Sequence, residues 1–234
     1  YTYFVSNHMG IYMMVPGQSA PQRISQQIEQ VLKAVDTGVN GIKLAWNDAF
    51  QGLDVFITPL AAPGPTTHYH YDWRSKAWFP FAFADENHNP LCCVTLDGNA
   101  AGDRVTLIGS WDGYVRKIDP SATDDDGTAI ESSVVIGPML TKDFDELILY
   151  DLQPILGDTS SDIDWEVLVG ATAEEALASE PVESGTWSGG RNLSDPVRAA
   201  GHAIYVRLSS SSPWAMEAIR ARVASQGKIR RRGR

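Results

Sequence analysis

The sequence feature that most limits the fold of this chain is an alternation of apolar and polar residues at a period of two, interrupted by turn residues. Successive side chains of a β-strand point to opposite faces, so this alternation is typical of strands with one buried face. In the first half of the chain it predicts strands at residues 2–6, 11–15, 42–47, 53–58, 66–73, 76–83, 91–96, 104–109 and 114–119. We therefore expect a mainly β protein.

Most of these strands fall into two antiparallel blocks, residues 42–83 and residues 91–119, with short turn-rich links between strands. The pair Asp112-Gly113 suits a hairpin corner because glycine tolerates positive φ. Blocks of this kind recur every ~40–50 residues in β-propellers. We therefore expect residues 1–121 to form partial, propeller-like blades that are too few to close a ring.

One segment of this region has helical rather than strand spacing. Its apolar residues are Ile24, Ile28, Val31, Leu32 and Val35. That spacing places them on one face of a helix. Ser19 and Pro21 are start signals and Gly38 is a stop signal. We predict one short helix at about residues 19–37, covering an edge or a face of the β domain.

From residue 129 onward the strand candidates are more widely spaced. They lie at residues 130–136, 146–152, 163–170, 185–187, 202–208 and 214–223, with one or two helical turns at 173–178. This pattern predicts a β-sandwich-like domain at residues 129–226. The acidic loop 122–128 is the expected boundary, and residues 227–234 form a basic C-terminal tail.

The charge of the chain is unevenly distributed. Residues 1–217 hold all 29 acidic and 12 of the 19 basic residues, a net charge of −17, and residues 218–234 carry +7. A body this acidic will not bind nucleic acid by neutralising phosphates. The tail could be solvated, touch nucleic acid or dock on the acidic surface of a neighbouring subunit. We expect it to make a contact with another subunit or protein. The predicted interface residues are Arg230, Arg231, Arg232 and Arg234.

Two groups of residues are candidates for metal binding. Asp124, Asp125 and Asp126 offer the oxygen ligands that calcium prefers, but their spacing does not match an EF-hand loop. His68 and His70 lie on one face of a strand and could begin a zinc site, for which a third ligand such as His88 or Asp72 is not placed by the sequence. The alternatives are a solvated turn and hydrogen-bonded strand histidines. We expect no metal and no cofactor.

Neither catalysis nor membrane insertion is indicated by a motif. The chain lacks G-x-S-x-G, P-loop and G-x-G-x-x-G patterns, so we expect no enzyme and no catalytic residues. No apolar run approaches the ~20 residues that span a bilayer, so no membrane contact is expected. Cys92 and Cys93 are adjacent on a predicted strand and poorly placed to form a disulfide, which favours a reducing cytoplasm.

Several stretches carry a family resemblance. They are residues 3–6, 10–12, 67–78, 113–119, 124–127, 130–138, 186–192, 198–201 and 214–217, together with the arginine-rich end. Over most of its length the chain resembles bacteriophage and prophage tail structural proteins of the propeller-bearing tail-nozzle or tail-hub type. Compared members are longer at the N-terminus, and Tyr1 agrees with a chain that begins inside a longer product. The shared motifs are structural and turn-forming, so no catalytic residues are transferred.

The resemblance implies a structural component of the virion tail, assembled in the host cytoplasm. Such a nozzle, hub or adaptor-type protein would help to form the conduit for DNA ejection. It implies a homo-oligomeric ring, for which a hexamer is one candidate, with other tail, adaptor or portal proteins as partners. A ring repeats one heterologous interface around its axis. DNA would pass nearby without specific binding, because an acidic wall repels phosphates.

Two alternatives remain at this point. A receptor- or glycan-binding tail module would use exposed aromatic residues such as Trp73, Trp78 and Trp111 to stack on sugars. A glycoside hydrolase would need two carboxylates ~5–10 Å apart in a cleft. A structural ring protein should instead have its aromatic residues buried within sheets or at subunit contacts.

Overall fold

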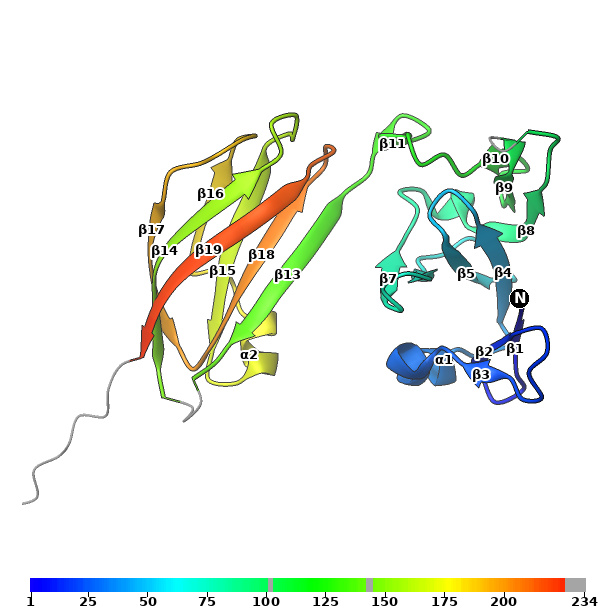
Figure 1. Ribbon diagram of the computed structural model, residues 1–234, viewed down its shortest axis with the longest axis horizontal. Helices are drawn as coiled ribbons and strands as arrows, with labels where there is room; N and C mark the ends of the chain where they lie inside the picture. Colours follow the sequence, from blue (N-terminus) through cyan, green and yellow to red (C-terminus); the bar gives the residue numbers. More distant parts are fainter. Residues whose placement is uncertain (101–102, 142–144, 226–234) are drawn as a thin grey trace, which may run out of the picture. The chain divides into compact units, whose positions relative to one another are not determined.

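The computed structural model describes residues 1–100, 103–141 and 145–225 of the chain. The protein is mainly β, as the alternating pattern predicts (Figure 1). It divides into two compact units, Tyr1–Thr128 and Ala129–Arg234. Within the described ranges, every helix is too short or too polar to cross a membrane.

Unit 1 is built on a central antiparallel sheet with strand order β4-β5-β6-β7. Its strands are β4 (Asn40–Asn47), β5 (Gly52–Pro59), β6 (His68–Asp72) and β7 (Trp78–Phe81). β5 is buried along nearly its whole length because both faces of the sheet are covered. Leu53, Val55 and Ile57 point to one face, and their neighbours point to the other.

The first face of the central sheet is covered by the N-terminal segment. This segment contains β1 (Thr2–Val5), β2 (Ile11–Met14), β3 (Gln22–Arg23), the 3-10 turn η1 (Gln26–Ile28) and helix α1 (Glu29–Ala34). The helix predicted at 19–37 is therefore wrong in its bounds. Gln22 pairs with Met13 in β2, and the Ser25 hydroxyl accepts a hydrogen bond from the Ile11 amide, so the sheet holds the chain up to residue 25.

The second face of the central sheet packs against a three-stranded sheet of order β10-β9-β8. Its strands are β8 (Pro90–Leu96), β9 (Val105–Ser110) and β10 (Val115–Lys117). Phe56 of β5, Ala45 of β4 and Ile108 of β9 share a small apolar core between the two sheets. Both sheets are antiparallel meanders of the kind predicted, and a propeller made from them stays a prediction.

Unit 2 is a two-sheet sandwich, as predicted. One sheet has the strand order β13 (Ser132–Met139), β18 (Ala203–Ser210), β15 (Ile163–Gly170) and β16 (Glu183–Trp187). The other has the strand order β17 (Asp195–Gly201), β14 (Leu147–Leu156) and β19 (Met216–Ser225). Both sheets contribute to one core, in which Trp165 and Trp187 stack with ring centroids 5.3 Å apart.

Two features of unit 2 matter for its surface. Helix α2 (Ala173–Ala178), expected as one or two turns, packs Ala176 against Leu168 and Tyr205 on the outer side of the four-stranded sheet. Strand β17 was not predicted, because Pro196 and two alanines obscure its alternation. Val197 and Ala199 are nonetheless buried in the sandwich core, which leaves Arg198 exposed on the outer side.

Candidate functional site

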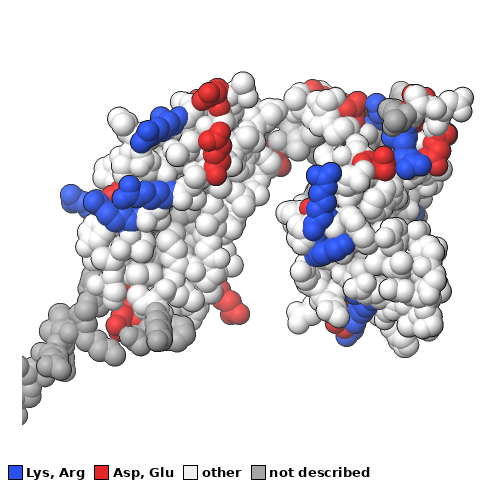
Figure 2. Space-filling model, viewed as in Figure 1, with Lys and Arg blue, Asp and Glu red and all other residues white. Residues whose placement is uncertain are grey.

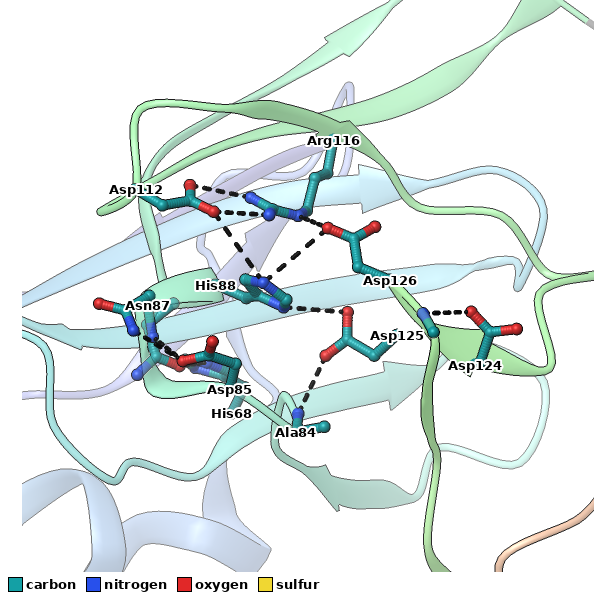
Figure 3. A network of polar contacts seen from close by, with 12 residues as sticks. His68, Ala84, Asp85, Asn87, His88, Asp112, Arg116, Asp124, Asp125 and Asp126 are labelled. Carbon is teal, nitrogen blue, oxygen red and sulfur yellow. Dashed lines mark hydrogen bonds and ion pairs between the residues drawn. The ribbon is translucent and has the colours of Figure 1, made fainter.

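The three aspartates proposed as calcium ligands belong to one tight hairpin. Asp124 and Asp125 form β11 (Asp124–Asp125), and Asp126 lies in the turn that leads to β12 (Thr128–Ala129). The turn needs positive φ at Asp126 and Gly127, at 52° and 87°. Asp124 stabilises it by accepting a hydrogen bond from the Gly127 amide at 2.7 Å. The next two carboxylates are thereby directed away from Asp124 and towards His88 (Figure 3).

These carboxylates meet residues that are distant in sequence. His88 ends the 3-10 turn η2 (Glu86–His88), Asp112 lies between β9 and β10, and Arg116 lies in β10. We call His88, Asp112, Arg116, Asp125 and Asp126 the His88 cluster. The His88 Nδ1 atom lies 3.3 Å from an Asp125 oxygen. Its Nε2 atom lies 3.8 Å from Asp126 and 3.9 Å from Asp112 (Figure 3).

Arg116 is the cation that joins two carboxylates of this cluster. Its two terminal nitrogens donate to both oxygens of Asp112, at 2.9 and 2.6 Å, and its Nε donates to Asp126 at 2.7 Å. Bidentate arginine–carboxylate pairs of this geometry are strong, charge-assisted contacts. The hydrogen bonds from Arg116 lower the pKa of Asp112 to about 2, and those same contacts raise the pKa of Arg116. Both groups are therefore charged at neutral pH.

These contacts anchor the acidic turn to two neighbouring segments of unit 1. Asp125 accepts a hydrogen bond from the Ala84 amide at 2.9 Å, so the turn is tied both to the segment before η2 and to the β9–β10 hairpin. A hard cation would have to compete with the Arg116 guanidinium for the same carboxylate oxygens. Within residues 1–100, 103–141 and 145–225, no group of three or more histidine, cysteine or acidic residues has an arrangement that could hold a metal ion.

We expect Arg116→Ala to loosen this turn without unfolding unit 1. A network of partly exposed ion pairs contributes about 1 kcal/mol, so exchange of the Ala84 and Gly127 amide hydrogens should accelerate about fivefold. Hydrogen exchange followed by NMR would measure this. The matched control is Arg104→Ala, because Arg104 pairs with Asp97 and Asp48 elsewhere in the unit. Equal exchange in the two variants would remove the anchoring role.

His68 lies on the same face of β6 as His70 but is separately engaged. Its Nδ1 accepts a hydrogen bond from the Ile57 amide at 3.2 Å, so the proton of the neutral ring lies on Nε2. Nε2 lies 3.0 Å from the Asn89 side-chain oxygen, and the ring packs against Phe56, Phe81 and Phe83. Burial lowers the pKa of His68 to about 4, so it is neutral at pH 7.

His70 belongs to a second hydrogen-bonded chain. Its Nδ1 lies 2.6 Å from one Asp54 oxygen, and the other Asp54 oxygen accepts a hydrogen bond from the side-chain Nδ2 of Asn47 at 2.8 Å. A histidine–carboxylate pair resembles half of a catalytic triad. Here the far edge of the ring is covered, since a Cβ added to Gly52 would lie 2.4 Å from His70 Nε2. This close approach of backbone to ring indicates a structural pair.

Together these groups form a polar layer between the two sheets of unit 1. We define the polar layer as Asn47, Asp54, Thr58, His68 and Asn89, all of which are buried. Thr58 donates to the Pro90 carbonyl at 2.7 Å, and Asn89 donates to the Gly64 carbonyl at 2.8 Å. These bonds join β5 and the β5–β6 loop to the segment that begins β8. The layer fixes how the two sheets pack.

The tryptophans proposed as a glycan platform are packed against their neighbours. Trp73 lies against the Tyr1 ring and under the Lys76 amine, which is 3.1 Å from the ring centroid. Trp78 packs on Tyr71 and donates to a backbone carbonyl. Trp111 is half-buried. The four predicted interface residues Arg230, Arg231, Arg232 and Arg234 lie outside the described residues.

His88, named above as a candidate third zinc ligand beside His68 and His70, contacts Asp125 instead. The sequence pattern did not identify Asp112 and Arg116 as partners of the acidic turn. Their four-residue spacing across the Asp112-Gly113 corner was a usable signal, because a short hairpin brings such positions together. A scan against protein-family models and a search of curated protein sequences find no match to this chain.

Proposed function

We propose that this chain is a structural component of a bacteriophage tail, of the nozzle, hub or adaptor type. Its copies would assemble into a ring that forms part of the conduit for DNA ejection. The resemblance of the turn-forming stretches to tail proteins motivates the proposal. A mainly β chain made of two compact units agrees with it.

The packing of the tryptophans favours this proposal over a glycan-binding role. All seven are buried or half-buried. Trp73, Trp78 and Trp111, which would have to face solvent to stack on sugars, are among the half-buried ones. Aromatic side chains packed in this way contribute buried apolar area to the sheets, which supports a structural role.

The polar groups also support a structural role over a hydrolytic one. Carboxylates that could act as acid and nucleophile are engaged by fixed partners: Asp112 and Asp126 by Arg116, and Asp54 by His70 and Asn47. The abundant acidic residues would instead serve the conduit, because negative charge repels the phosphates of passing DNA. A ring with a basic lumen would remove this part of the proposal.

Immunogold electron microscopy tests the proposal directly. Antibodies raised against the recombinant chain should label the tails of phage particles purified from the source of this sequence. An antibody against a host cytoplasmic protein, applied to the same particles, is the control. Label that is absent from particles, or that is confined to particle-free fractions, would contradict a tail role.

A further inference from the structure

One outer face of unit 2 gathers arginines. They lie on the exposed side of the β17-β14-β19 sheet, where pairing sets Arg222 opposite Asp151, Arg220 opposite Gln153 and Arg191 opposite Ile155. Arg198 joins them because it alternates with buried residues of β17. We call Arg191, Arg198, Arg220 and Arg222 the arginine face. Figure 2 shows blue side chains gathered over this sheet.

Most of this positive charge is uncompensated. Arg222 pairs with Asp151 at 2.5 Å and lies over the Tyr150 ring. For Arg191, Arg198 and Arg220, the part of the chain that the structure describes supplies no ion-pair partner within 4.0 Å. Exposed arginines clustered without partners, in a chain of net charge −10, are available to bind an acidic surface.

The opposite outer face of the same sandwich has the complementary chemistry. It belongs to the β13-β18-β15-β16 sheet, in which Asp164 and Glu166 alternate with core residues of β15. Asp164 accepts a hydrogen bond from Thr186, and Glu166 pairs with Arg207 at 3.1 Å. A shallow hollow at this face is lined by carboxylates and hydroxyls: Glu131, Ser132, Ser133, Asp164, Ser209, Ser210 and Ser211. We call these residues the acidic face.

We propose that the arginine face of one copy binds the acidic face of the next copy. Guanidinium groups pair well with carboxylates and hydroxyls, so the two faces match in chemistry as well as in charge. Because the faces lie on opposite sides of one sandwich, the contact is head-to-tail. Repeating a head-to-tail contact generates a closed ring or an open filament. This inference deepens the proposed ring and rests on that proposed function.

A second copy fits the arginine face better than nucleic acid does. The chain as a whole repels polyanions, and the unpaired arginines are few compared with the phosphate contacts of typical DNA-binding proteins. A second copy would place only its acidic face against these arginines, so few charges need to be paired in the contact. Attraction between these charged faces should weaken with added salt.

Paired charge reversals test the contact. Arg198→Glu with Arg220→Glu reverses the arginine face, and Glu131→Arg with Asp164→Arg reverses the acidic face. In sedimentation velocity at low salt, each double variant alone should associate about 100-fold more weakly than the native chain. An equimolar mixture should recover association to within about tenfold, because each variant then meets a complementary face. Lys33→Glu with Arg74→Glu in unit 1 is the control and should associate normally.

Unchanged thermal unfolding of the variants would exclude misfolding as the cause of weaker association. A native chain that stays monomeric at high concentration and low salt would overturn the inference. Native-like association of both reversed variants would also overturn the inference, but it would leave the tail proposal intact. If the variants behave as expected and the antibodies fail to label phage tails, the tail proposal alone fails. Arginine-dependent binding to a short DNA duplex, without self-association, would identify nucleic acid as the occupant instead.

Discussion

Lowering the pH from 6.5 to 4 should cost unit 1 about 3 kcal/mol of unfolding free energy through His68 alone. Its pKa of about 4 in the folded chain is below the ordinary 6.5, so the unfolded chain takes up the proton first. The stabilisation is therefore complete above pH 6.5 and declines as the pH falls towards 4. The main physical cause is burial, which penalises the charged ring, and a proton on Nδ1 would also displace the hydrogen bond that this atom accepts from the Ile57 amide.

The matched variant is His68→Gln, which keeps a polar side chain but does not titrate. It should be less stable than the native chain at pH 7 and should lack the additional loss between pH 6.5 and 4. Urea unfolding at a series of pH values, followed through exchange of unit 1 amides, measures both. Parallel pH profiles for the two proteins would show that His68 is not buried as a neutral base.

Replacing Trp187 by alanine should lower the unfolding free energy of unit 2 by about 3–5 kcal/mol. Its indole ring is almost wholly buried, stacks on Trp165 and donates a hydrogen bond to Asp195 of β17. The substitution therefore opens a cavity where the two sheets of the sandwich meet and leaves a carboxylate without its donor.

Trp187→Phe separates these two effects because it keeps a ring and removes the donor. We expect it to cost about 1.5–3 kcal/mol, the cost of one lost hydrogen bond to a charged group. Denaturant unfolding of both variants provides the comparison. The pH dependence assigned to His68 should be the same in both, since His68 lies in unit 1. A loss below about 1 kcal/mol for the alanine variant would contradict the packing described for the sandwich.

The strands were predictable because alternation is a local record of burial. β15 occupies the residues expected, 163–170, since both its core and its turns are marked in the sequence. The helix was overextended for an equally physical reason. Ile24 and Ile28 have helical spacing, but pairing of Gln22 in β2–β3 and the hydroxyl of Ser25 hold the chain before the helix begins. Tertiary contacts there override local periodicity.

The clusters were less predictable, because their partners come from distant segments. The shared face of His68 and His70 follows from strand geometry alone. What each ring contacts does not, since Asn89 and Asp54 are brought there by the packing and pairing of sheets. The arginine face was hidden in part for the same reason: Arg198 lies in a strand that the sequence did not reveal, while Arg220 was counted with a basic C-terminal segment.

If this chain works by assembly, its mass in solution is the most direct test. Multi-angle light scattering of the purified chain at low salt, with electron microscopy of the same fractions, should give a single integral multiple of the monomer mass and closed rings of uniform diameter. A monomer at every concentration, with no ring in the images, would contradict the view that this protein acts as a building block.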